Sequence, residues 1–196
     1  MGIFAHMRIA LIRAVIGFSL CVTAQAAETS DNPELPIQFI NAIPDICFRT
    51  VRGHPPTAEN ADTLSLEPTT DVPVKVQIHF YKVTSWFRLK SAPNSILVGV
   101  GDGTNCHLVL TNSVRTREVQ DKVISLMRAV GAQTIQGTSP SATFTDMVFV
   151  NKAPDGYFLI SLQAPRDTVR EGDGEQAAVH VGLMSKEMYE SMLSKH

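Results

Sequence analysis

The feature that most limits the fold is a series of short strand-like segments separated by turn sequences. One apolar segment ends at the Gly-Asp-Gly of residues 101–103, another is followed by the Pro-Asp-Gly of residues 154–156, and a second strand-like segment comes after each. Such turns are typical of hairpins. The predicted strands are residues 74–81, 106–111, 144–150, 157–162 and 177–183, with further strand material at 86–90 and 96–100. Hairpin-joined strands form antiparallel sheets.

Three segments have helical periodicity. Residues 34–52, 114–130 and 185–193 each repeat apolar side chains at three- and four-residue steps, with Pro44 inside the first segment. Proline lacks a backbone donor, so we expect a kink there or two short helices. The apolar positions of the first two are Ile37, Ile40, Ile43, Cys47 and Val51, then Val119, Val123, Leu126 and Val130. The sequence therefore predicts an α+β domain with helices packed on one face of a mainly antiparallel sheet of about five or six strands.

The first 26 residues have the order of an export signal. Arg8 and Arg13 precede the uncharged segment 14–24, and Ala24-Gln25-Ala26 is the small-residue pattern before a cleavage site. That segment is shorter than the roughly 20 apolar residues a membrane-spanning helix needs. The alternative is an N-terminal core helix. We expect cleavage after residue 26, a periplasmic or secreted protein, and no stable membrane insertion afterwards.

Cleavage would leave residues 27–196 as a single domain, with a flexible segment at 27–33 and a long loop at 53–73. It would remove two arginines and no acidic residue, which lowers the net charge from −2 to −4. Nucleic-acid binding needs a surplus of basic residues, so this charge argues against a nucleic-acid partner.

Three cysteines occur, and only Cys47 and Cys106 follow the predicted signal. An even pair in an exported domain predicts a disulfide. The alternative is a catalytic or metal-binding cysteine, but the chain has no C-x-x-C spacing. For Cys21 the alternative fate is lipidation, although Leu20 is larger than the small residue that usually precedes a lipidated cysteine.

Short catalytic signatures are absent from the sequence. It contains no G-x-S-x-G, S-x-x-K or H-E-x-x-H, although a triad dispersed along the chain would leave no such signature. Gly99-x-Gly101-x-Gly103 differs from a dinucleotide fingerprint because the third glycine comes one residue early and a strand follows it. A hairpin turn explains these glycines better, and no cofactor is predicted.

Histidines are the one candidate source of acid–base or ligand chemistry. His79, His107 and His180 each fall in a predicted strand, and each alternates with the apolar side chains. All three are therefore expected on the polar face of one sheet, where they could bind zinc if their strands are neighbours. The alternative is three independent surface histidines.

Two weaker candidates involve other side chains. His180, Met184, Met188, Met192 and His196 recur every four residues near the C-terminus, a pattern that suits monovalent copper. We favour Met188 and Met192 as the apolar stripe that docks the last helix on the core. The second candidate is a polar strand face, and it consists of Lys75, Gln77, His79 and Tyr81 with nearby Trp86.

The function expected from these observations is binding, without catalysis. The sequence favours a small exported binding or accessory protein with an unidentified protein or small-molecule partner. The alternative is a hydrolase or metal-dependent enzyme that uses a dispersed histidine site on the sheet.

Overall fold

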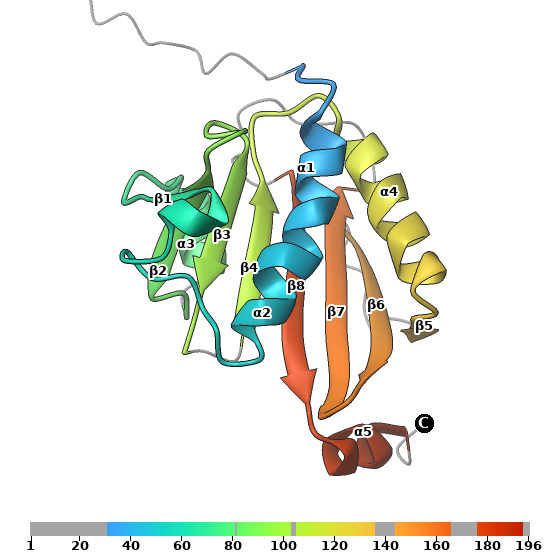
Figure 1. Cartoon of the computed structure of the whole chain (residues 1–196). Helices are drawn as coiled ribbons and strands as arrows, with labels where there is room; N and C mark the ends of the chain where they lie inside the picture. Colours follow the sequence, from blue (N-terminus) through green and yellow to red (C-terminus); the bar gives the residue numbers. More distant parts are fainter. Residues whose placement is uncertain (1–30, 81, 103–104, 136–143, 166–175, 194–196) are drawn as a thin grey trace, which may run out of the picture.

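The computed structural model describes residues 31–80, 82–102, 105–135, 144–165 and 176–193 (Figure 1). The predicted signal peptide, including Cys21, lies outside the described residues, and so does most of the segment 27–33.

The described strands form one antiparallel sheet of eight strands in the order β1-β2-β3-β4-β8-β7-β6-β5. Their bounds are β1 (Leu66–Pro68), β2 (Ser85–Leu89), β3 (Ile96–Val100), β4 (Asn105–Leu110), β5 (Gln133–Ile135), β6 (Phe144–Ala153), β7 (Gly156–Pro165) and β8 (Ala177–Met184). The α+β fold and the antiparallel sheet are confirmed. The strand number is higher than predicted because β1 and β5, with three residues each, are too short to show alternation.

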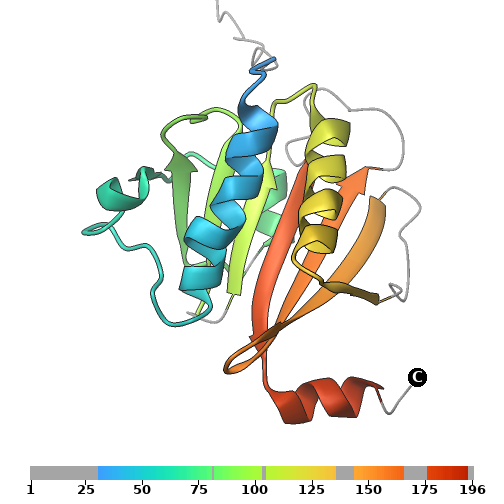
Figure 2. The same ribbon diagram turned by 45° about the vertical axis from the view of Figure 1, so that its right-hand side comes forward.

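Two helical segments cover one side of this sheet, which we call the front face (Figures 1 and 2). The first runs through α1 (Leu35–Ala42), η1 (Ile43–Cys47) and α2 (Phe48–Thr50), and the second is α4 (Thr116–Ala129). Together with the inward side chains of the strands they enclose the larger hydrophobic core. The front face therefore has the predicted layered arrangement of helices on a sheet.

Pro44 changes the winding of the first helical segment without ending it. In an α-helix the carbonyl of Ile40 would accept a hydrogen bond from the N–H of residue 44, but proline has no N–H. The carbonyl of Ile40 instead accepts from the N–H of Ile43. The N–H of Phe48 then donates to the carbonyl of Ile43, one residue further than in an α-helix, so η1 is a π-helix.

The wider π turn aligns a stripe of buried residues with a spacing of four. These residues are Leu35, Phe39, Ile43, Cys47 and Val51. A regular α-helix of 3.6 residues per turn would wind such a stripe around its surface. The prediction was right for the last three positions and wrong for Ile37, which is 40% exposed because the stripe begins at Leu35.

Helix α4 confirms the predicted central helix with a corrected inner face. Val119, Val123 and Met127 are fully buried, whereas Leu126 is only partly buried and Val130 is 42% exposed. Val130 lies beyond the last helical turn, where Gly131 takes a positive φ of 73° and ends the helix.

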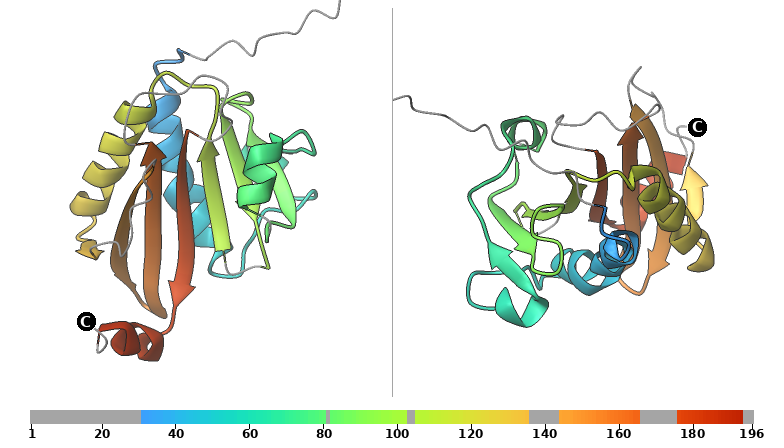
Figure 3. Two further views of the ribbon diagram at one scale, coloured as in Figure 1. Left: turned by 180° about the vertical axis from the view of Figure 1, so that it is seen from behind. Right: turned by 90° about the horizontal axis from the view of Figure 1, so that it is seen from above.

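The strand predicted at residues 74–81 is wrong, because α3 (Val74–His79) is a helix. Val72, Val76 and Phe80 are spaced by four and form a second, smaller core with side chains of β3, β4 and β8. Apolar residues at every second position fit a strand, but they also provide the four-residue spacing of a helix. The contact of Val76 and Phe80 with the second core favours the helix. Helix α3 lies on the back face of the sheet (Figure 3), so the prediction of helices on one face only is also wrong.

The polar strand face predicted around residues 75–81 therefore does not exist as a strand. Lys75 and Gln77 are exposed on α3, and Tyr81 lies outside the described residues. The loop at 53–73 contains a short 3₁₀-helix, η2 (Asp62–Leu64), and the edge strand β1.

Helix α5 (Lys186–Leu193) lies beyond the end of β8 (Figures 1 and 2). Tyr189 stacks on Tyr157 of β7 with ring centroids 4.1 Å apart. Met188 is 61% exposed, so its predicted role in docking this helix is wrong. The side chain of Met192 and all of His196 lie outside the described residues, so the copper stripe stays a prediction.

Candidate functional site

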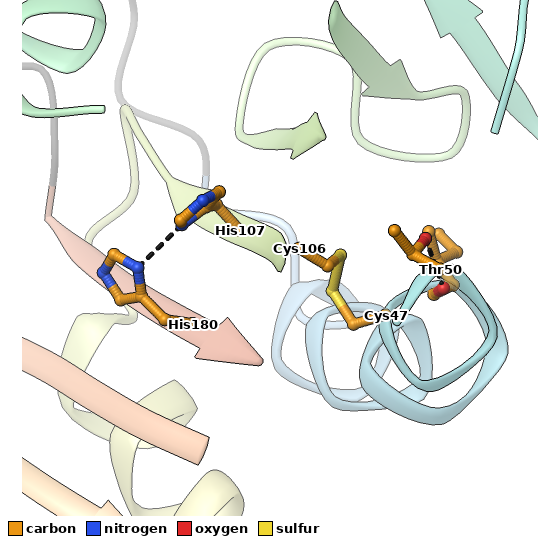
Figure 4. The surroundings of a disulfide bond; sticks show 6 residues. Cys47, Thr50, Cys106, His107 and His180 are labelled. Atoms are coloured by element: carbon orange, nitrogen blue, oxygen red, sulfur yellow. Dashed lines mark hydrogen bonds between the residues drawn. A yellow bond between two sulfur atoms is a disulfide. The ribbon is translucent and has the colours of Figure 1, made fainter. Parts of the chain in front are cut away.

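The disulfide between Cys47 and Cys106 is confirmed. It joins η1 to β4 on the front face, with a Cα–Cα distance of 5.2 Å and both side chains fully buried (Figure 4). This distance lies within the usual range for disulfide bridges. The bond therefore ties the first helical segment to the centre of the sheet.

His107 and His180 meet on the back face, opposite the disulfide (Figure 4). They are direct cross-strand partners of β4 and β8, and their Nδ1 atoms are 2.7 Å apart. Successive side chains of a strand point to opposite faces of the sheet. Cys106 and Leu108 point to the front core, so His107 between them points to the back. One ring donates its Nδ1–H and the other accepts at Nδ1, so the two rings adopt different tautomers or share one proton.

Phe80 covers this histidine pair. Its ring centroid lies 5.1 Å from the His107 ring and 5.0 Å from the His180 ring. Next to it, Trp86 packs against Gly99, the cross-strand partner of His107, so closely that a Cβ there would meet the indole at 2.9 Å. The pair is thus half-buried under an aromatic layer at the middle of the sheet.

The structure brings together two of the three histidines predicted to share a face. His79 ends α3 instead of lying in a strand, and its side chain is not among those described. Within the described part of the chain, no group of three or more His, Cys, Asp or Glu side chains could hold a metal ion. The three-histidine zinc site therefore stays a prediction.

A groove on the front face lies between the first helical segment and the β1–β2 edge, with a volume of about 480 Å³. We call it the helix groove. Its apolar side chains are Ala42, Pro44, Ile46, Leu64 and Leu89. Its polar side chains are Gln38, Asn41, Asp45, Arg49, Thr63, Ser65 and Ser91. The ion pair of Lys90 with Asp62 stands beside it and lowers the pKa of the Asp62 carboxyl through a hydrogen bond and charge attraction.

Several polar groups of the helix groove are unused within the described structure. The Oε1 atom of Gln38 is inaccessible to solvent and accepts no hydrogen bond from any described residue. Asn41, Asp45 and Arg49 likewise form no side-chain hydrogen bond or ion pair with the described residues. A buried acceptor without a donor is costly, so a rotation of the half-buried Gln38 amide that brings Oε1 to a ligand N–H or O–H would be favourable.

A second groove lies beside the loop before α3 and has a volume of about 690 Å³. Its polar side chains are largely engaged. The hydroxyl of Thr84 donates to the carbonyl of Val100 at 3.1 Å, and the Nε2 of Gln77 donates to the carbonyl of Val72 at 2.7 Å. The larger groove thus offers fewer free polar groups than the helix groove.

Sequence reasoning missed the helix groove, although a signal for it was present. Gln38, Asn41, Asp45 and Arg49 repeat at three- and four-residue steps beside the apolar stripe of the same helix. A polar stripe of this kind predicts only a solvated helix face. The opposite side of the groove is lined by Ser65, Leu89 and Ser91, and these residues come close to the helix only in the folded structure.

Searches against family models, curated proteins and solved structures give no match to this chain. Among the described residues, no helix is long and apolar enough to cross a membrane.

Proposed function

We propose that this chain is a small exported binding protein that holds an amphiphilic small molecule in the helix groove and catalyses no reaction. The observation that carries the proposal is the groove itself, in which an apolar floor lies beside polar groups that no described residue uses. Ligand sites typically combine an apolar lining with a few well-placed polar groups in about 300–1,000 Å³.

The lining indicates the chemistry of the ligand. The apolar floor suits a flat or branched hydrocarbon body, and Gln38 suits an N–H or O–H donor. Arg49 on the rim suits an anionic group. These features favour an amphiphilic molecule with one donor and one acidic group.

Two observations support the other parts of the proposal. A disulfide persists in oxidising compartments, which supports the periplasm or the exterior as the location. The described lining of the groove has no imidazole beside its hydroxyl groups, and its one carboxylate, that of Asp45, forms no hydrogen bond with them, which supports binding without catalysis. The enzyme alternative would use the histidine pair on the opposite face.

Anilinonaphthalene sulfonate is a suitable probe because it has an aromatic body, an anilino N–H and an anionic group. We expect saturable binding of one probe molecule to the folded chain, measured by its fluorescence. Ser91→Trp fills the groove from its exposed rim and abolishes this binding. Thr70→Trp places the same bulk in the second groove and is the matched control.

The outcomes separate the two grooves. Loss of binding in Ser91→Trp with retention in Thr70→Trp supports the helix groove. Loss in Thr70→Trp alone, equal binding in both variants, or no saturable binding to the folded protein overturns the proposal. Circular dichroism melts confirm that each variant is folded, since loosely packed states also bind this dye.

A further inference from the structure

The histidine pair on the back face has the arrangement of a preformed two-nitrogen ligand set. His107 and His180 belong to the two central strands, and each strand is hydrogen-bonded to neighbours on both sides. Their backbones are therefore fixed by the sheet, and their Nδ1 atoms already lie 2.7 Å apart. The sheet already fixes both backbones, so only the two rings have to turn for both nitrogens to bind one ion.

The chemistry of the two ligands indicates which ion suits them. The 2.7 Å between the Nδ1 atoms is a hydrogen-bond distance, and it changes when the rings turn towards an ion. The choice of ion therefore rests on the two imidazole ligands. Tetragonal coordination is preferred by Cu²⁺ and Ni²⁺, and Cu²⁺ has the highest affinity of the divalent ions for imidazole.

We propose that His107 and His180 bind one Cu²⁺ ion through their Nδ1 atoms, in place of the proton that they share. The donor ring moves its proton from Nδ1 to Nε2, so both rings stay neutral and each offers one lone pair to the ion. Both rings turn so that the lone pairs, which face each other in the hydrogen bond, converge on the ion.

The surroundings of the pair are consistent with this ion. Ser161 is the cross-strand partner of His180 on β7 and offers a hydroxyl next to the site. Phe80 limits access from the side of α3. The two thiols that would favour Cu⁺ or Zn²⁺ are held in the disulfide on the front face.

The single tryptophan of the chain provides a local readout. Trp86, Gly99, His107 and His180 are successive cross-strand partners, so the indole lies two strands from His107, or about 10 Å. Cu²⁺ is paramagnetic and quenches indole fluorescence at this range. Titration of the full chain with Cu²⁺ against glycine as a weak competitor should give saturable quenching with one ion bound.

Asparagine variants test the ligands with little loss of volume. His107→Asn and His180→Asn should each weaken Cu²⁺ binding by more than the roughly 10–100-fold that loss of a supporting residue costs at a metal site. His54→Asn, which removes an exposed histidine outside the sheet, is the matched control and should bind like the native chain. Electron paramagnetic resonance of the native complex should show a tetragonal signal coupled to two imidazole nitrogens.

Several results would overturn the proposal. These are quenching that does not saturate, equal binding by the native chain and the His107→Asn and His180→Asn variants, and a signal with fewer than two imidazole nitrogens. Displacement of Cu²⁺ by an equal concentration of Zn²⁺ would refute the choice of ion. If the asparagine variants fail to fold, the nitrogen count in the native spectrum decides.

Discussion

Reduction of the Cys47–Cys106 disulfide should cost this domain a large part of its stability. The two cysteines are 59 positions apart, and the chain-entropy model gives about 4 kcal/mol at 25 °C for opening a loop of that length. Domains are stable by about 5–15 kcal/mol, so the loss is substantial. With an m value of about 2 kcal/mol per molar urea, the unfolding midpoint falls by about 2 M.

The assay compares oxidised and reduced protein by urea unfolding. Both sulfur atoms are buried, so the reduced form is prepared by unfolding in reductant and refolding, and mass spectrometry confirms the gain of two hydrogens. Keeping the thiols in place isolates the cross-link, because no cavity is created. In Cys47→Ala/Cys106→Ala, reductant should have no effect. A difference below about 1 kcal/mol between the oxidised and reduced native chain would contradict the loop-entropy reasoning.

Three further predictions concern single side chains. Gly99→Ala should cost about 1–3 kcal/mol in urea unfolding, because the new Cβ overlaps the indole ring at 2.9 Å. Met127→Ala should cost about 2–5 kcal/mol in the same assay, while Met188→Ala changes stability little, since the first side chain is buried and the second exposed. Lys90→Met should raise the pKa of the Asp62 carboxyl toward the ordinary value of an aspartate in an NMR titration. The ion pair contributes stability above the unfolded pKa, and this contribution is lost as the pH falls through the lower folded pKa.

The sequence was most informative where a single period explained a segment. Strands β6, β7 and β8 and helix α4 were found because alternation or helical spacing extends over many residues there. Residues 74–81 were misassigned because apolar residues at 74, 76, 78 and 80 also supply the four-residue spacing of a helix. The contact of Val76 and Phe80 with the back of the sheet decides between the two structures, and no local pattern contains it.

The two candidate sites differ in how much of each could be predicted from the sequence. Parity on strands placed His107 and His180 on one face, but their pairing depends on β4 and β8 being neighbours, which strand order in the sequence does not reveal. The helix groove depends on a wall from β1 and β2 that approaches α1 only after folding. The sequence therefore indicated which residues carry chemistry at both sites, but it did not indicate that these residues lie close together.

The disulfide and the histidine pair lie back to back on β4, and their contributions should be separable. Cys106 anchors the strand from the front, but β4 also pairs with β3 over five positions and with β8 over six. These ladders alone fix the position of His107. In Cys47→Ala/Cys106→Ala, well below its melting temperature, Cu²⁺ should therefore quench the Trp86 fluorescence with unchanged affinity although the protein is less stable. A tenfold loss of affinity would instead show that the cross-link itself positions the imidazole.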